Sequence, residues 1–454
     1  MTFSYLPKRL SRQFTALRQR LIGRRNLKSF LTLNLGALFT KATGFVRQPL
    51  LLAYLGREQT DYLLAGDRVG QLLTLLFVGG TLYSAVLPQL VSARQRSGRE
   101  LREVISWFFL IVTLGLALAT GGLVWQLDFL LSHWLKADFL ARLSPAEVQK
   151  FYFCVYLLLI SPFLFAYQSL IRAYLSLLDR YKSAALVGGV TNVIVIGSVL
   201  WSGGDYLRVA YGLLTGFGVS TLIILYEGFL AGFSFQFGRF SRVYPYLVNF
   251  TKNALPRTLI VDSQVLGGLI LVAFVNFEGQ LAAVEIWSSI LGAFAFVSSA
   301  YLTVIFPQLA TYHSLSSEAQ NSLIRRSFRN LCRVGKYQVG LSIFGGLGIF
   351  FLYDLVFGLE FKNYLSLLLI CSVPTIVCRL FTGYLQQILF ALEDNFVILA
   401  SLLANGLLVL TTYGLNRVGL DAGVALILGL NVGNITTVYL ITRYLRTRYG
   451  ISFR

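Results

Sequence analysis

Long apolar runs separated by short polar segments dominate the sequence. Most of the runs approach the roughly 20 residues that cross a bilayer as a helix. The ten-residue segments of alternating polarity that are typical of a membrane β-barrel are absent from the sequence. The pattern predicts an all-α polytopic membrane protein with about twelve spans, of which the second is tilted or broken at Gly79-Gly80. The predicted spans are 31–55, 62–92, 104–126, 152–175, 183–202, 207–232, 254–277, 283–309, 337–356, 364–390, 396–414 and 421–442.

The composition supports this class. Apolar residues make up 56% of the chain and charged residues 13%, against about 25% charged in a soluble domain. The two histidines, His133 and His313, are too few for a histidine-based metal site or catalytic triad. The cysteines lie in or beside apolar runs without metal-ligand spacing, so we interpret them as packing residues. They are Cys154, Cys332, Cys371 and Cys378.

The basic residues predict the orientation of the chain. With both termini in the cytoplasm, 26 of the 39 lysines and arginines lie in cytoplasmic segments, 7 in external loops and 6 inside spans. The positive-inside rule favours this orientation over the opposite one. Most of the net charge of +19 is thereby explained, and no nucleic-acid ligand is needed. Residues 1–30 carry eight of these charges at amphipathic spacing, which favours a helix on anionic lipid over a disordered tail.

Two pairs of similar segments indicate an internal repeat. The segment around Pro88 resembles that around Pro307, 219 residues later, and the segment ending at Asn192 resembles the one ending at Asn405, 213 later. Two six-helix lobes in parallel orientation imply a pseudo-two-fold axis along the membrane normal, with a binding site between the lobes. The expected segments are an N-terminal region 1–30, a lobe 31–232, an amphipathic linker 233–253, a lobe 254–442 and a basic tail 443–454.

Charged residues inside spans are the candidate chemistry, because each costs about 2.5–3.5 kcal/mol at the centre of a lone helix on insertion scales. Arg172 and Arg379 occupy similar places in two spans and can snorkel or pair. The other four basic residues inside or near spans predict a binding site for an anion. The alternative is that they only form structural ion pairs with acidic residues of the protein. They are Lys41, Arg47, Arg68 and, near a span end, Arg257. The acidic candidates for gating or charge pairing are Asp61, Asp67, Asp262 and Glu285.

Helix geometry sets a condition on the anion site. Lys41 and Arg47 are six residues apart, which places them about 120° apart around a straight helix. The two side chains can therefore share one ligand only if the helix bends. Gly44 and Pro49 are the residues at which a bend is expected, because Pro49 removes a backbone hydrogen bond.

Several short motifs resemble the MurJ/MviN lipid II flippase family. Thr40 to Arg47 resembles its first-helix motif, although Lys41 stands where an arginine is usual. Thr60-Asp61, Arg68 and the segment ending at Pro88 follow its second helix. Ala254 to Leu259 resembles its seventh-helix motif, and Phe390 to Asp394 the end of its tenth helix. The family's last two helices have no counterpart in the 454 residues.

The resemblance implies the fold of the MOP superfamily, which includes the MATE exporters: two six-helix lobes around a basic cavity. It implies a bacterial cytoplasmic-membrane flippase that moves an undecaprenyl-pyrophosphate-linked glycan, with lipid II first, in peptidoglycan and cell-wall synthesis. In the family, arginines matching Arg47 and Arg257 line the cavity. We expect a monomer without a metal or cofactor, driven by a coupling ion or the membrane potential. A flippase for another lipid-linked oligosaccharide, a MATE-like cation-coupled exporter and a non-transporting scaffold remain alternatives.

Overall fold

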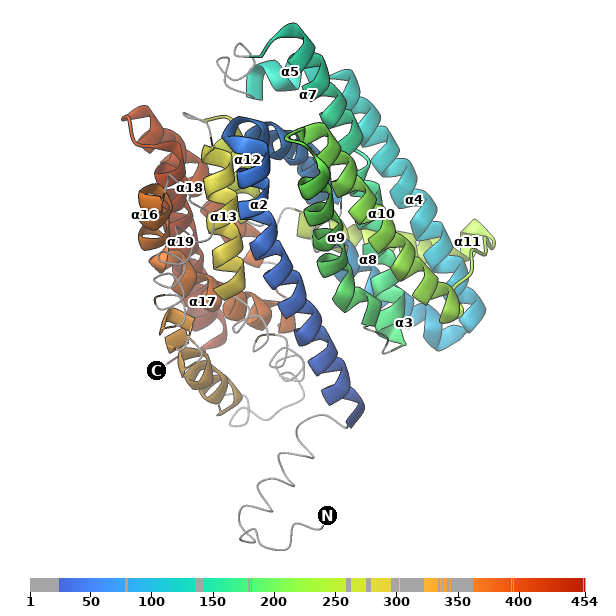
Figure 1. Cartoon of the computed structure of the whole chain (residues 1–454). Coiled ribbons are helices and arrows are strands. Elements are labelled where there is room, and N and C mark those ends of the chain that lie inside the picture. Colours follow the sequence, from blue (N-terminus) through green and yellow to red (C-terminus); the bar gives the residue numbers. More distant parts are fainter. Residues whose placement is uncertain are drawn as a thin grey trace, which may run out of the picture.

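The computed structural model describes residues 24–77, 81–134, 143–178, 182–258, 263–274, 279–294, 322–333, 362–392 and 396–451, with short stretches between and beyond them. The described chain is almost entirely helical, as the apolar runs predict. Its helices gather in two groups, and the long helix α2 (Arg24–Phe77) lies between them (Figure 1).

The first group contains α3 (Thr81–Arg96), α4 (Gly98–Trp125), α5 (Leu127–Trp134), α7 (Pro145–Leu158), α8 (Ser161–Leu177), α9 (Lys182–Trp201), α10 (Tyr206–Leu230) and α11 (Phe240–Thr258). The second contains α12 (Ser263–Val272), α13 (Gln280–Phe294), α16 (Lys362–Cys371), α17 (Val373–Ala391), α18 (Phe396–Arg417) and α19 (Ala422–Tyr449). A further helix covers residues 322–333.

Six described helical stretches are long and apolar enough to cross a membrane: Gly98–Trp125, Pro145–Leu177, Lys182–Trp201, Tyr206–Leu230, Phe396–Arg417 and Ala422–Tyr449. Asn363–Cys371 and Val373–Leu389, bent by 42°, form a further candidate. These seven coincide with predicted spans three to six and ten to twelve. The second predicted span corresponds to the end of α2 and to α3, and its residues 78–80, which include the Gly79-Gly80 pair, lie outside the described residues. Most of the ninth lies outside the described residues. The chain is a multi-pass membrane protein.

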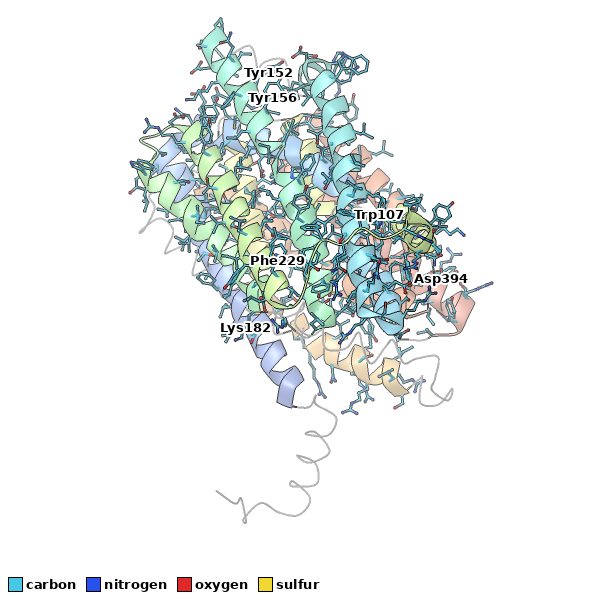
Figure 2. All side chains as sticks on the ribbon, turned by 90° about the vertical axis from the view of Figure 1, so that its right-hand side faces the viewer. Trp107, Tyr152, Tyr156, Lys182, Phe229 and Asp394 are labelled. Carbon is cyan, nitrogen blue, oxygen red and sulfur yellow. The ribbon has the colours of Figure 1, made fainter. Side chains whose placement is uncertain are left out.

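The segment that follows α10 packs against helices of the first group and is hydrogen-bonded to α4. In the extended stretch 233–239, Gly238 accepts a hydrogen bond from Trp107 Nε1 on α4 (3.2 Å; Figure 2). Buried Val243 and Tyr246 of α11 belong to one hydrophobic cluster with residues of α3 and α4. The Tyr246 hydroxyl donates to Glu100 at 2.7 Å. The helix is continuous to Thr258, so the predicted boundary between 253 and 254 falls inside α11.

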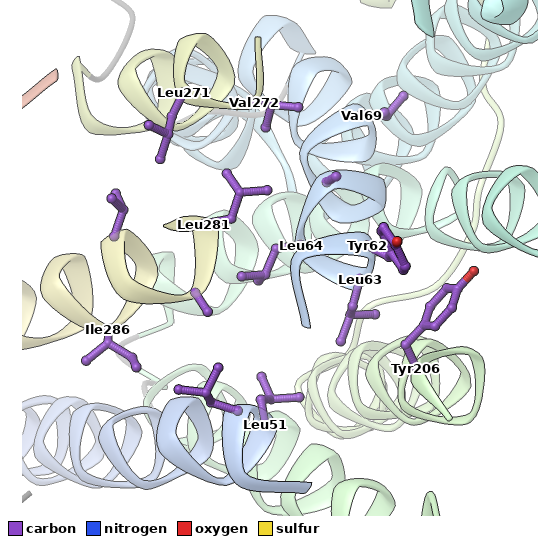
Figure 3. Close-up of a cluster of buried hydrophobic side chains, with 14 of the residues drawn as sticks. Leu51, Tyr62, Leu63, Leu64, Val69, Tyr206, Leu271, Val272, Leu281 and Ile286 are labelled. Carbon is purple, nitrogen blue, oxygen red and sulfur yellow. The ribbon is translucent and has the colours of Figure 1, made fainter. Parts of the chain in front are cut away.

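The largest hydrophobic core crosses from α2 into the second group. Leu51 and Leu64 of α2 lie in one cluster with Leu271 of α12 and with Leu281 and Ile286 of α13 (Figure 3). Each of these side chains is less than 10% exposed. Because lipid tails are as apolar as these side chains, close packing rather than removal from water stabilises this contact. The two groups are therefore joined along α2.

Candidate functional site: charged contacts between α2 and α13

A sharp turn at Gly56 divides α2 into two helical segments. Gly56 has a φ of 77° and is the one residue within α2 with non-helical dihedral angles. An L side chain rarely adopts this conformation, whereas glycine does so without steric cost. The Thr60 hydroxyl, fully buried, donates to the Gly56 carbonyl at 2.6 Å and lies 3.3 Å from the Leu51 carbonyl. The turn thereby sets the two charged segments of α2 beside each other.

Small residues let the first segment of α2 pack closely against α9. A Cβ atom built on Gly36 would lie 2.3 Å from the carbonyl oxygen of Ala185, and one built on Gly44 would lie 3.3 Å from Asn192 Nδ2. Small residues at helix contacts are a general device for close packing in membranes. This close approach brings the polar side chain of Asn192 to the α2 backbone.

Asp61 binds the beginning of α13. Its carboxylate accepts hydrogen bonds from the backbone nitrogens of Gly279 at 2.7 Å and Ala282 at 3.1 Å. The first backbone N–H groups of a helix have no partner within the helix, and a carboxylate there also complements the helix dipole. Asp61 is 3% exposed. It therefore acts as the N-terminal cap of a helix that begins 219 residues later in the chain.

Glu285, on the same helix, holds both segments of α2. Its carboxylate forms an ion pair with Arg68 and accepts from Gln48 Nε2 at 3.4 Å. Arg68 also donates to Gln71, whose amide donates to Asp67 at 2.6 Å. We call the contacts that Asp61, Gln48 and Arg68 make with α13 the α2–α13 seam. From Asp61 to Arg68 it covers roughly 10 Å of helix.

Arg47 lies on the α9 side of α2 and is only partly satisfied. Its Nη1 donates to Asn192 Oδ1 at 3.1 Å, while Asn192 Nδ2 donates to the Thr40 carbonyl at 3.0 Å and to the Thr43 hydroxyl at 3.2 Å. Among the described residues, the buried Arg47 Nε has no hydrogen-bond partner. The guanidinium therefore keeps donor capacity that this state of the protein does not use.

Lys41 lies on the other side of the same segment, against α13. Its Nζ would be 2.9 Å from a Cβ atom built on Gly292. No carboxylate among the described residues pairs with it. The backbone from Lys41 through Pro49 keeps helical dihedral angles, so Lys41 and Arg47 contact different helices, α13 and α9. The structure does not bring these two side chains together on one ligand.

Two of the predicted site residues have no described side chain. Arg257 belongs to the last turn of α11, but its side chain lies outside the described part, and Asp262 lies outside the described residues altogether. In the described part of the chain, no three His, Cys, Asp or Glu residues gather in a way that could hold a metal ion. The chemistry that the seam can perform is ion pairing and hydrogen bonding.

Three polar residues of the site, Gln48, Gln71 and Asn192, were not predicted as site residues from the sequence. Neutral amides carry no insertion penalty comparable to that of a charge, so they do not stand out in an apolar run. One signal existed for Asn192, because the two similar segments of the second repeat pair end at Asn192 and at Asn405. No comparable signal marks Gln71.

The comparisons with known proteins give the fold. No family model and no curated protein matches the sequence. Among solved structures, the chain resembles the lipid II flippase MurJ in an inward closed conformation, with a TM-score of 0.71 and 14% identity over 92% of this chain and 87% of that one. The chain has the fold of the MOP-superfamily transporters.

Multidrug transporters of the MATE family share that fold. An inward-facing MATE transporter of the MOP superfamily aligns with a TM-score of 0.64 and 15% identity over 93% of this chain and 98% of that one. A MOP-superfamily transporter from Pyrococcus furiosus aligns with a TM-score of 0.65 and 15% identity over 93% of this chain and 96% of that one. The expectation of a MurJ-like and MATE-like fold is confirmed.

Proposed function

We propose that this protein is a transporter, not an enzyme, that moves an undecaprenyl-pyrophosphate-linked glycan across the cytoplasmic membrane by alternating access. Lipid II is the first substrate to test, which places the protein in cell-wall synthesis. The observation that carries the proposal is the half-buried guanidinium of Arg47 beside Asn192, whose buried Nε has no hydrogen-bond partner among the described residues. A diphosphate supplies the acceptor oxygens that this group lacks, because guanidinium and phosphate form charge-assisted, often bidentate hydrogen bonds.

The charges around α2 support an anion over a cation as cargo. Arg68 is neutralised by Glu285, and Asp67 is held by Gln71. Lys41 and Arg47 have no carboxylate in hydrogen-bond contact among the described residues. An anion that reached either side of the first segment of α2 would therefore meet a positive charge without a hydrogen-bonded carboxylate: Lys41 on the α13 side or Arg47 on the α9 side. Arg257 is proposed as a further contact on the strength of the motif at 254–259.

The α2–α13 seam supports alternating access. It joins the two helix groups through a charged cap at Asp61 and an ion pair at Arg68, and both can break and re-form without loss of helical structure. We propose that Asp61, Arg68 and Glu285 act as the gate at the Gly56 end of the molecule. Under the predicted topology this end is external, so the state described is closed toward the outside.

Complementation of a flippase-depleted strain tests the proposal. We expect Arg47→Ala and Arg257→Ala each to abolish growth while leaving membrane expression intact, and Arg47→Lys to restore growth in part. Arg172→Ala is the matched control, since Arg172 is another arginine within a span with a partnerless Nε among the described residues, but it contacts Gln168 on its own helix. Normal growth of both Arg47→Ala and Arg257→Ala would reject the anion site.

A MATE-like exporter of small molecules is the second candidate, because the chain covers 98% of a MATE transporter and 87% of the MurJ chain. That function predicts binding of a cationic drug that is lost on replacement of Glu285 or Asp262. A flippase predicts loss of function at Arg47 and no drug binding. If the wild-type chain fails to support growth with lipid II but does so with another polyprenyl-linked oligosaccharide, the proposed mechanism holds with a different glycan.

A further inference from the structure

A groove on the outer face of α19 is separate from the α2–α13 seam. It has a volume of about 800 Å³ and lies between α19 and Cys378 of α17. The residues that line it on α19 recur at positions i, i+3, i+4, i+7, i+8, i+11 and i+12 and therefore form one stripe of the helix. They include Ile435, Val438, Tyr439, Thr442, Arg443 and Arg446.

The groove is apolar at one end and basic at the other. Ile435 and Val438 line the apolar end, where Ile435 is 50% exposed and, within the described part of the chain, uncovered. Arg443 and Arg446 line the basic end, near the last residue of α19. A hydrophobic channel that ends in two cations fits an amphiphile with an anionic head.

The dimensions match one leaflet of a bilayer. Ile435 and Arg446 are eleven residues apart, which corresponds to roughly 16 Å along a helix. The hydrocarbon core of a bilayer is about 30 Å thick, so one leaflet contributes about half of that. Because α19 has 28 residues, it is roughly 42 Å long and extends beyond the hydrocarbon. Its basic last turns therefore lie at the level of the lipid headgroups.

Neither arginine is neutralised within the described part of the chain. Arg443 Nη1 donates to the Tyr439 hydroxyl at 3.3 Å, and no described carboxylate pairs with Arg443 or Arg446. The nearby acidic residue Asp394 is engaged elsewhere, because it accepts hydrogen bonds from the hydroxyls of Tyr444 at 2.9 Å and Tyr449 at 2.6 Å. Two guanidinium groups thus remain available for a phosphate.

We propose that this groove binds an anionic phospholipid of the surrounding bilayer. Arg443 and Arg446 hold the headgroup phosphate, and an acyl chain lies along Ile435 and Val438 toward Cys378. The groove shares no residue with the seam and is one leaflet deep, which favours a resident lipid over the transported one. The site does not depend on the proposed function.

Native mass spectrometry of the full chain in detergent tests this site. The protein is titrated with phosphatidylglycerol and with phosphatidylcholine that carry the same acyl chains. We expect phosphatidylglycerol to bind more tightly. Arg443→Gln and Arg446→Gln should each weaken its binding about fivefold, and the double variant about thirtyfold, since a basic residue near a membrane surface contributes about that much.

Arg417→Gln is the matched control. Arg417 lies at the end of α18 and donates to Tyr413, four residues earlier, as Arg443 does to Tyr439. This variant should bind phosphatidylglycerol like the wild-type chain. Ile435→Asn keeps both arginines but places an amide in the path of the acyl chain, and it should weaken binding severalfold.

Three outcomes would overturn the proposal. Equal binding of the two phospholipids would exclude headgroup recognition. An Ile435→Asn variant with wild-type affinity, or an equal loss in Arg417→Gln, would show that the lipid does not lie in the groove. Displacement of phosphatidylglycerol by lower concentrations of undecaprenyl phosphate would assign the groove to the transported lipid instead.

Discussion

Replacing Asp61 by alanine should open the Gly56 end of the molecule. The carboxylate on α2 makes two hydrogen bonds to backbone nitrogens at the beginning of α13, in the second helix group, at 2.7 and 3.1 Å. A hydrogen bond to a charged group contributes about 1.5–3 kcal/mol, and losing a helix cap costs typically about 1 kcal/mol. Because such contributions are not additive, we expect a loss of about 3 kcal/mol from the closed state. A loss of that size shifts the ratio of closed to open molecules about a hundredfold.

Distances between spin labels can measure this shift. Trp201 at the end of α9 and Val418 after α18 are 86% and 84% exposed and belong to opposite helix groups. Both lie at the Gly56 end, because Gln59 binds the start of α10 and Gln280 binds Asp421. With cysteines at these two positions and the native cysteines replaced, double electron–electron resonance should show one short distance in the parent chain. Asp61→Ala should add a longer one.

The control separates gating from general loss of stability. Asp394 also caps a helix, accepting from the nitrogen of Phe396 at 2.8 Å, but it does so within the second group. Asp394→Ala should therefore lower the melting temperature and leave the distance between residues 201 and 418 unchanged. If Asp61→Ala gives the parent distance distribution, or if Asp394→Ala gives the same longer distance, the assignment of Asp61 to the gate is wrong.

Three further predictions follow from the same contacts. Arg68→Glu should abolish complementation, since it sets two carboxylates against each other at a half-buried contact. Glu285→Arg in the same chain should restore growth in part, and no rescue would contradict a direct pairing role. Gly36→Ala should lower the melting temperature by the equivalent of about 1–3 kcal/mol through overpacking against Ala185, whereas Gly197→Ala, which faces open space, should not. Burial alone raises the pKa of Asp394, but hydrogen bonds from Tyr449, Phe396 and Tyr444 and the charge of Arg448 hold it below its ordinary value of 3.8. The loss of stability caused by Asp394→Asn should therefore be largest above pH 3.8 and should shrink as the pH falls below that value. Thermal melts of the parent and variant chains between about pH 7 and 3 measure it. A difference in melting temperature that stays constant over this range would show that these bonds to the ionised carboxylate do not stabilise the fold.

The apolar pattern predicted the helices better than it predicted their partners. Predicted spans at 183–202, 207–232 and 396–414 agree with α9, α10 and α18 to within three residues at each end. Hydrophobic periodicity reports only which face of a helix avoids water. It could not predict that Glu285 pairs with Arg68, 217 residues away, or that Asp61 caps α13, because a cap supplied from another helix has no local sequence signature. Residues 240–253, predicted as part of an amphipathic linker, lie in one helix with residues 254–258, because polar residues on one face of an amphipathic helix do not interrupt its backbone.

The arrangement of charges suggests how cargo and gate are coupled under the proposed function. A ligand can shift a conformational equilibrium only by its difference in affinity between the two states. In the closed state Arg68 is occupied by Glu285, while Lys41 and Arg47 are not paired with any described carboxylate. A diphosphate that binds Arg47 and extends to Arg68 would compete with Glu285 for Arg68, and it would weaken the α2–α13 seam in proportion to its gain in affinity for the open state. A cationic ligand would instead compete with Arg68 for Glu285 and would add a positive charge near Lys41 and Arg47. The gate would therefore respond more strongly to an anion, which is the cargo that Lys41 and Arg47 favour.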